Sequence, residues 1–72
     1  MTFYIYATSF NDAKKVLNFL EENQITHNFA TFSEADNVLG FTNLHVIQIF
    51  LTDAEIDKYL TILEDFRLSI AR

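Results

Sequence analysis

The chain has 72 residues, a formal net charge of −5, no cysteine and two histidines. A chain of this length makes one domain, so we expect residues 1–72 to form a single domain, and the missing thiols exclude disulfides and a structural zinc site. The acidic balance disfavours contacts with nucleic-acid phosphates and anionic membranes, so we expect no nucleic-acid and no membrane partner. We also expect no cofactor and no metal.

The first half of the chain predicts a strand followed by a helix. Thr2–Tyr6 is aromatic and β-branched, which is typical of a strand, with Phe3 and Ile5 on one face. A helix is expected from about Asn11 to Asn23, capped by Ser9 or Asn11. Its buried stripe has helical spacing and comprises Ala13, Val16, Leu17 and Leu20.

A second strand is expected over Ile25–Phe32, although both of its faces mix polar and aromatic residues. This pattern indicates an edge strand and leaves its register open. Asn37 and Gly40 are the strong turn residues of the segment that follows, so Ser33–Gly40 is interpreted as a turn or long hairpin loop.

The second half predicts a central strand, a second helix and a short final strand or packed tail. Leu44–Leu51 is apolar on both faces, which favours a central position in a sheet. Thr52 and Glu55 form a capping box that starts a helix running to about Asp65. The buried stripe of this helix is Ile56, Tyr59, Leu60 and Leu63, and Leu68–Ile70 would complete the sheet.

The order β-α-β-β-α-β predicts an α+β fold of the ferredoxin-like type, a four-stranded antiparallel sheet in the order four-one-three-two with two helices on one face. The opposite face would then be open. Its expected residues are the candidate interface: Tyr4, Tyr6, Leu44, Val46, Gln48 and Phe50. Either a protein partner covers this face, or polar rims or the segment Ser33–Asn43 keep it soluble.

Residues with catalytic or ligand-binding chemistry are sparse. His27 and His45 have no acidic partner at ligand spacing, no serine lies in a nucleophile elbow, and one glycine cannot make a phosphate loop. We therefore expect no catalytic residues and no enzyme activity. The acidic second helix is better explained by capping and solvation than by mimicry of nucleic-acid phosphates.

Two resemblances follow from the element order. The first strand resembles that of an RNA-recognition motif, but Val46–Phe50 lacks the basic residues such domains need. Thr8–Ala13 and Leu20–Ile25 resemble the joints of small ferredoxin-like domains described as signal-transducing proteins, similar to the PII/GlnB class. Val46–Leu51 with Asp53–Glu55 resembles the third strand of these domains and its helix. That resemblance implies a regulatory or ligand-sensing interaction domain and assigns no site residues.

The residues together predict a non-enzymatic protein-interaction or regulatory module that uses the open face and self-associates as a homodimer. The alternatives are a small phage-type inhibitor that binds a host protein and a small-ligand sensing domain. No secretory signal or membrane-length apolar run stands out, and the composition is typical of AT-rich coding. We therefore expect a cytoplasmic protein of a bacterium, or of a host cell if it is phage-encoded.

Overall fold

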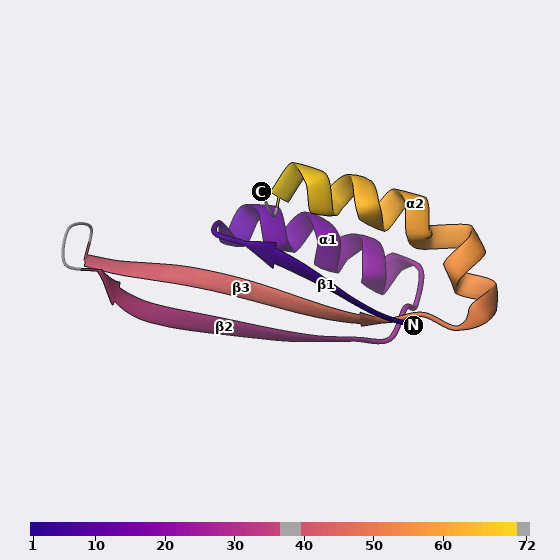
Figure 1. Ribbon diagram of the computed structural model, residues 1–72, viewed down its shortest axis with the longest axis horizontal. Coiled ribbons are helices and arrows are strands. Elements are labelled where there is room, and N and C mark those ends of the chain that lie inside the picture. Colours follow the sequence, from indigo (N-terminus) through magenta and orange to yellow (C-terminus); the bar gives the residue numbers. More distant parts are fainter. Residues whose placement is uncertain (37–39, 71–72) are drawn as a thin grey trace.

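The computed structural model describes the backbone of residues 1–36 and 40–70 and the side chains of residues 1–33 and 43–67. Within these residues the fold is α+β, with two helices on one face of a three-stranded antiparallel sheet (Figure 1). The elements are β1 (Thr2–Ala7), α1 (Phe10–Glu22), β2 (His27–Asp36), β3 (Gly40–Phe50) and α2 (Asp53–Ile70).

The predicted starts of both helices are confirmed. Ser9 is the N-cap of α1, and its Oγ accepts a hydrogen bond from the Asp12 amide at 3.4 Å. The predicted capping box begins α2: the Thr52 amide donates to Glu55 Oε1 at 3.0 Å, and the Glu55 amide donates to Thr52 Oγ1 at 3.3 Å. Each side chain thus satisfies an amide that has no partner within the helix.

The end of α1 is a Schellman motif with an unusual residue in it. The Ile25 amide donates to the Leu20 carbonyl at 2.9 Å, and the Gln24 amide donates to the Glu21 carbonyl at 3.2 Å. This geometry places Gln24 in the left-handed region, with φ at 55°, where glycine is usual. Leu20 and Ile25 are both buried, so the motif also fixes the path of the chain into β2.

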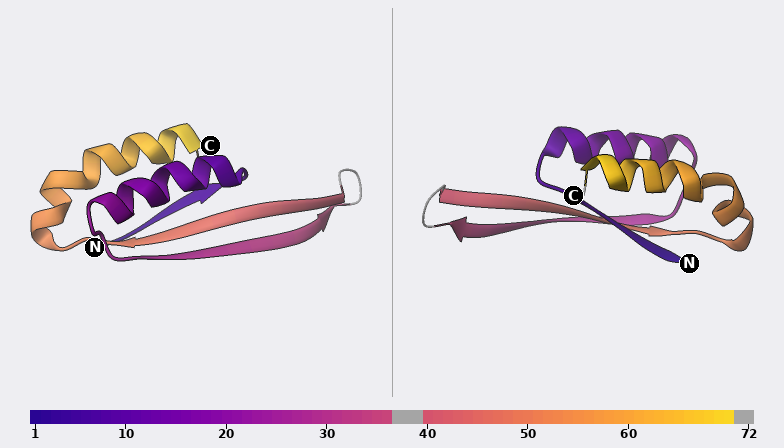
Figure 2. Two further views of the ribbon diagram at one scale, coloured as in Figure 1. Left: turned by 180° about the vertical axis from the view of Figure 1, so that it is seen from behind. Right: turned by 45° about the horizontal axis from the view of Figure 1, so that its top comes forward.

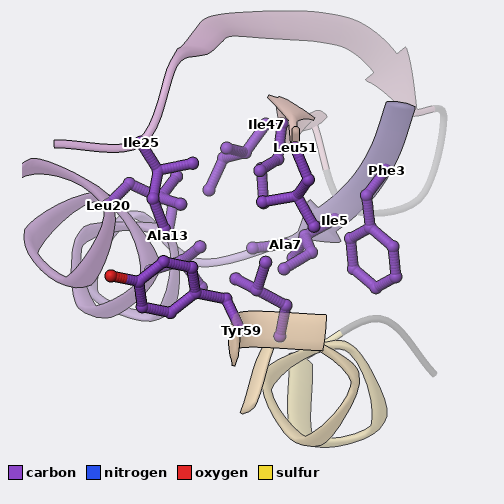
Figure 3. Close-up of a cluster of buried hydrophobic side chains, with 12 residues drawn as sticks. Phe3, Ile5, Ala7, Ala13, Leu20, Ile25, Ile47, Leu51 and Tyr59 are labelled. Carbon is purple, nitrogen blue, oxygen red and sulfur yellow. The ribbon is translucent and has the colours of Figure 1, made fainter. Parts of the chain in front are cut away.

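The sheet has the order β1-β3-β2, with β3 pairing both neighbours in antiparallel register. This matches the expected places of the first three strands. Alternate residues of β1 and β3 face the helices and form the core with side chains of α1 and α2 (Figure 3). The buried members on the strands are Phe3, Ile5, Ala7, Ile47 and Ile49, and Leu51 directly after β3 is buried with them.

The helices pack on each other as well as on the sheet. The ring of Phe19 in α1 meets Tyr59 of α2 edge-on, at a centroid distance of 5.9 Å, and lies 5.6 Å from Phe66. Tyr59 and Leu63 of the predicted α2 stripe are buried, while Ile56 and Leu60 are partly buried. Aromatic contacts of this kind add about 0.5–1.5 kcal/mol beyond area burial.

Two expectations about chain segments are wrong. Leu68–Ile70, expected as a fourth strand or a packed tail, is the end of α2, because no Pro or Gly stops the helix after Asp65. Ser33–Asp36 and Gly40–Asn43, expected as turn or loop, are strand residues paired with each other, and the expected turn at 37–39 lies outside the described residues. The β2–β3 hairpin therefore extends past the helices as an arm instead of folding over the open face (Figure 2).

Replacement of Gln24 by glycine should stabilise the protein. Gln24→Gly removes the steric cost of a side chain at positive φ, so we expect the free energy of unfolding to rise by about 0.5–1 kcal/mol. Urea denaturation followed by circular dichroism measures the change. The matched control is Asn18→Gly at an exposed position inside α1, which should lower stability by about 0.5 kcal/mol. Equal destabilisation by both changes would contradict the Schellman assignment.

Candidate protein-interaction face

The structure places the predicted interface residues on one face of the sheet. Thr2 pairs with Phe50, Tyr4 with Gln48 and Tyr6 with Val46. Directly opposed residues of antiparallel strands point to the same side, and side chains alternate along each strand. The buried partners of the helices lie at odd positions of β1 and β3, so the even positions, Leu44 included, form the face away from the helices.

This open sheet face exposes several large apolar side chains to solvent. Tyr4 and Tyr6 are each 41% exposed and Leu44 is 38% exposed, while Val46, Gln48 and Phe50 are partly buried by their neighbours. Both helices cover the opposite face (Figure 2). Exposed apolar residues are normal singly, but a contiguous group across two strands is a candidate interaction surface.

β2 contributes three further residues that the sequence pattern could not assign. Its register pairs Asn28 with Gln48, Ala30 with Val46 and Phe32 with Leu44, so these residues belong to the open sheet face. Phe32 is 55% exposed and is the largest addition. The aromatic residues Phe29 and Phe32 lie on opposite sides of β2, and this removed the alternation that would have shown the register.

A chain of side-chain amides and a hydroxyl crosses the open sheet face. Asn28 Nδ2 donates to Gln48 Oε1 at 3.2 Å, and Gln48 Nε2 donates to Tyr4 Oη at 3.0 Å. These bonds link β2, β3 and β1, and they satisfy both ends of the Gln48 amide. The Gln48 amide is therefore engaged within the face, which lowers the cost of removing it from water.

A hollow of about 180 Å³ lies on the open sheet face next to these hydrogen bonds. Tyr4, Phe32, Val46 and Gln48 are among the residues that line it. Sites for drug-sized ligands usually measure about 300–1,000 Å³. The hollow is smaller than that range, and its lining is mainly apolar. Its size and chemistry suit an inserted apolar side chain better than a cofactor.

Charge is segregated between the two layers of the molecule. Eight of the ten acidic residues lie in α1 and α2, and the other two, Glu34 and Asp36, lie toward the tip of the arm. β1 and β3 contain no charged residue. The open sheet face formed by β1, by β3 and by β2 as far as Phe32 can therefore be desolvated without burying a charge, which would cost several kcal/mol for each ion.

The two histidines do not form a site together. His45 is 6% exposed, and its Nδ1 is 2.9 Å from Thr31 Oγ1. His27 Nδ1 is 2.7 Å from the Ile25 carbonyl oxygen. His27 pairs with Ile49, four positions along β3 from His45, so the two backbone positions are separated by roughly 13 Å along the strand. Among the side chains described, no group of three His, Cys, Asp or Glu residues is placed to hold a metal ion.

Aromatic packing explains the burial of His45. Phe10 meets its ring edge-on at 5.8 Å, and Phe29 stacks on it at 6.0 Å. Phe10 and Phe29 also lie 6.4 Å apart, so the three rings form a cluster at the start of α1. This cluster, on the helix side of the sheet, was not expected from the sequence, where Phe10 stood outside the buried stripe of the first helix.

A scan of the chain against protein-family models finds no match, and searches of curated proteins and of solved structures find none either. The resemblance to PII/GlnB-like domains therefore stays a prediction. No helix within the described residues is both long and apolar enough to cross a membrane.

Neighbouring residues of β3 should respond differently to truncation. Ile47→Ala removes a fully buried side chain from the core, so we expect a loss of about 2–5 kcal/mol in the free energy of unfolding. Val46→Ala acts on the open sheet face and should cost about 1 kcal/mol or less. Urea denaturation of both variants at low protein concentration measures the difference. Similar losses would show that both faces are buried in the isolated chain.

Proposed function

We propose that the protein is a non-enzymatic protein-interaction or regulatory module that self-associates through its open sheet face. The observation that supports this most strongly is an uncharged face of tyrosines, aliphatic residues and Phe32 that both helices leave uncovered. Tyrosine, phenylalanine and other aromatic residues are enriched at protein interfaces, while charged residues are depleted from their centres.

The small size of the chain favours a partner. A domain of about 60 residues buries only about 60% of the surface that its unfolded chain exposes, so its stability is marginal. Association supplies additional burial where disulfides are lacking, and this chain has no cysteine. A second copy suits the charge distribution, because carboxylates that would repel a like-charged chain lie on the other layer or toward the tip of the arm.

The wider setting of the module follows from the same features. The order β1-α1-β2-β3-α2 supports a relation to the ferredoxin-like pattern, which small regulatory domains of the PII/GlnB-like kind share. We place the protein in the cytoplasm of a bacterium or of a phage-infected cell, since its composition lacks cysteine and is typical of AT-rich coding. The small hollow on the face gives little support to ligand sensing.

Light scattering coupled to size-exclusion chromatography tests self-association. At high micromolar concentration we expect a particle mass that is a multiple of the 8.4 kDa chain. Tyr6→Lys places a charge in the face and should lower this mass, because an unpaired charge is costly to bury. Thr61→Lys adds the same charge on the exposed side of α2 and should leave the mass unchanged.

Two results would overturn the proposal. A wild-type mass of 8.4 kDa at high micromolar concentration would remove self-association. Equal loss of mass in Tyr6→Lys and Thr61→Lys would show that net charge, and not the open sheet face, controls the assembly. Circular dichroism of Tyr6→Lys should remain that of the folded protein, since its side chain lies outside the core.

A further inference from the structure

β2 forms one edge of the sheet, and its unpaired backbone groups can be assigned. The Phe50 amide donates to the Thr26 carbonyl at 2.9 Å, and the pairing of β2 with β3 continues from there without a change of register. In an antiparallel pair every second residue exchanges hydrogen bonds with its opposite, and the residues between direct their N–H and C=O groups outward. The outward residues of β2 therefore include Phe29, Thr31 and Ser33.

This edge lacks the features that usually protect an edge strand. Natural edges are blunted by shortness, by charged residues, by proline or by bulges. β2 is 10 residues long, and its register shows no bulge. The chain contains no proline, and the stretch from His27 to Ser33 contains no Asp, Glu, Lys or Arg. The uncharged stretch from His27 to Ser33, which has no bulge, is a template for another strand.

The arm gives this edge access to a partner. The β2–β3 hairpin projects beyond both helices in each view (Figure 1, Figure 2). The molecule is accordingly elongated, with extents of 45 × 19 × 19 Å. Where the arm leaves the body, Phe10 is 55% exposed and Phe29 is 37% exposed. Apolar surface on the helix side therefore accompanies the free backbone groups.

We propose that two copies of the chain join edge to edge, β2 against β2, in antiparallel register about a two-fold axis at Thr31. The proposal rests on the self-association proposed above and assigns it a second, separate surface. A two-fold pairing brings the outward donors of each copy to the outward acceptors of the other. Phe29 lies opposite Ser33 of the second copy, and residues 29–33 alone form about six backbone hydrogen bonds.

The register at Thr31 is the one that the side chains favour. It sets the exposed ring of Phe32 opposite Ala30 of the second copy, so a large residue meets a small one. It also sets position 34, a glutamate, opposite Asn28 and away from another carboxylate. A shift of the axis to Phe32 would set position 34, the glutamate, opposite Ala30. The methyl group of Ala30 offers a carboxylate no polar partner, so this register is less favourable.

This pairing has a consequence for the open sheet face. Opposed residues in an antiparallel pair share a side, so the helices of both copies lie on one side of a six-stranded sheet. The two open sheet faces then lie side by side and form one continuous surface of about twice the area. Each arm also lies along the body of the other copy, with its Ser33 next to the exposed Phe29.

Residue-resolved amide hydrogen exchange, measured by NMR on the wild-type chain at two concentrations, tests the edge contact. In the isolated chain the amides of Phe29, Thr31 and Ser33 have no strand partner and exchange fast. Once nine-tenths of the chains are paired, we expect these amides to exchange about tenfold more slowly. Fast exchange at both concentrations would overturn the proposal, whether the face alone associates or another protein occupies the edge.

A pair of variants gives an independent readout. Thr31→Pro removes the outward amide, and Thr31→Val is its control, because both lose the hydroxyl that meets His45 while only proline loses the N–H. We expect Thr31→Pro to halve the particle mass relative to Thr31→Val. Equal masses would overturn the edge contact. If Thr31→Pro does not fold, Ser33→Pro against Ser33→Ala makes the same comparison farther out on the arm.

The two proposals fail in different ways. If only the edge contact exists, Tyr6→Lys leaves the mass unchanged and Thr31→Pro gives the 8.4 kDa chain. If only the face contact exists, Tyr6→Lys gives the single chain and the Thr31 variants agree with each other. With both contacts present, each change halves the mass and the double variant is monomeric.

Discussion

The structure depends on the two-residue period of β3. This strand pairs with β1 on one side and with β2 on the other, so its alternation sets the faces of both neighbours. Its odd positions carry Ile47 and Ile49 into the core beneath the helices. Its even positions carry Leu44 and Val46 to the opposite side. A slip of one residue would exchange the two sets, which explains why the apolar pattern of the strand specifies one arrangement.

Within the described residues the open sheet face has no helix packed on it, because both helices lie on the other side of the sheet. Both helices lie on the same side of the sheet and pack against each other through Phe19, Tyr59 and Phe66. Nearly all charge is carried by this helical layer, which is therefore the natural solvent surface. The sheet surface that the helices leave uncovered is the one that we propose for association.

The elements with clear local signals were predictable from sequence. The capping box at Thr52 and Glu55, the Ser9 cap and the central character of Leu44–Leu51 are local patterns, and the structure confirms them. All six candidate interface residues are even positions of β1 and β3, and the alternation of these strands was readable from the sequence. The structure tests their placement on one face, while their role as an interface is a proposal.

The features that were missed depend on tertiary contacts or on ambiguous periods. Phe66, Leu68 and Ile70 alternate as in a short apolar strand, but Phe66 and Ile70 also continue the helical spacing from Leu63. Sequence alone could therefore not exclude either structure. The polar residues from Ser33 to Asp36 have weak strand propensity and are held in β2 by pairing with β3. The register of β2, and with it the place of Phe32, became clear only from that pairing.

The claim that the sheet, and not the helical layer, is the surface on which copies meet can be tested most directly by isotope-filtered NMR. A mixed sample of labelled and unlabelled wild-type chains at high micromolar concentration reports contacts between copies alone. We expect intermolecular contacts from the methyl groups of Leu44 and Val46 to the rings of Tyr4, Tyr6 or Phe32. Intermolecular contacts confined to exposed residues of α1 and α2, such as Ile62, would contradict the claim.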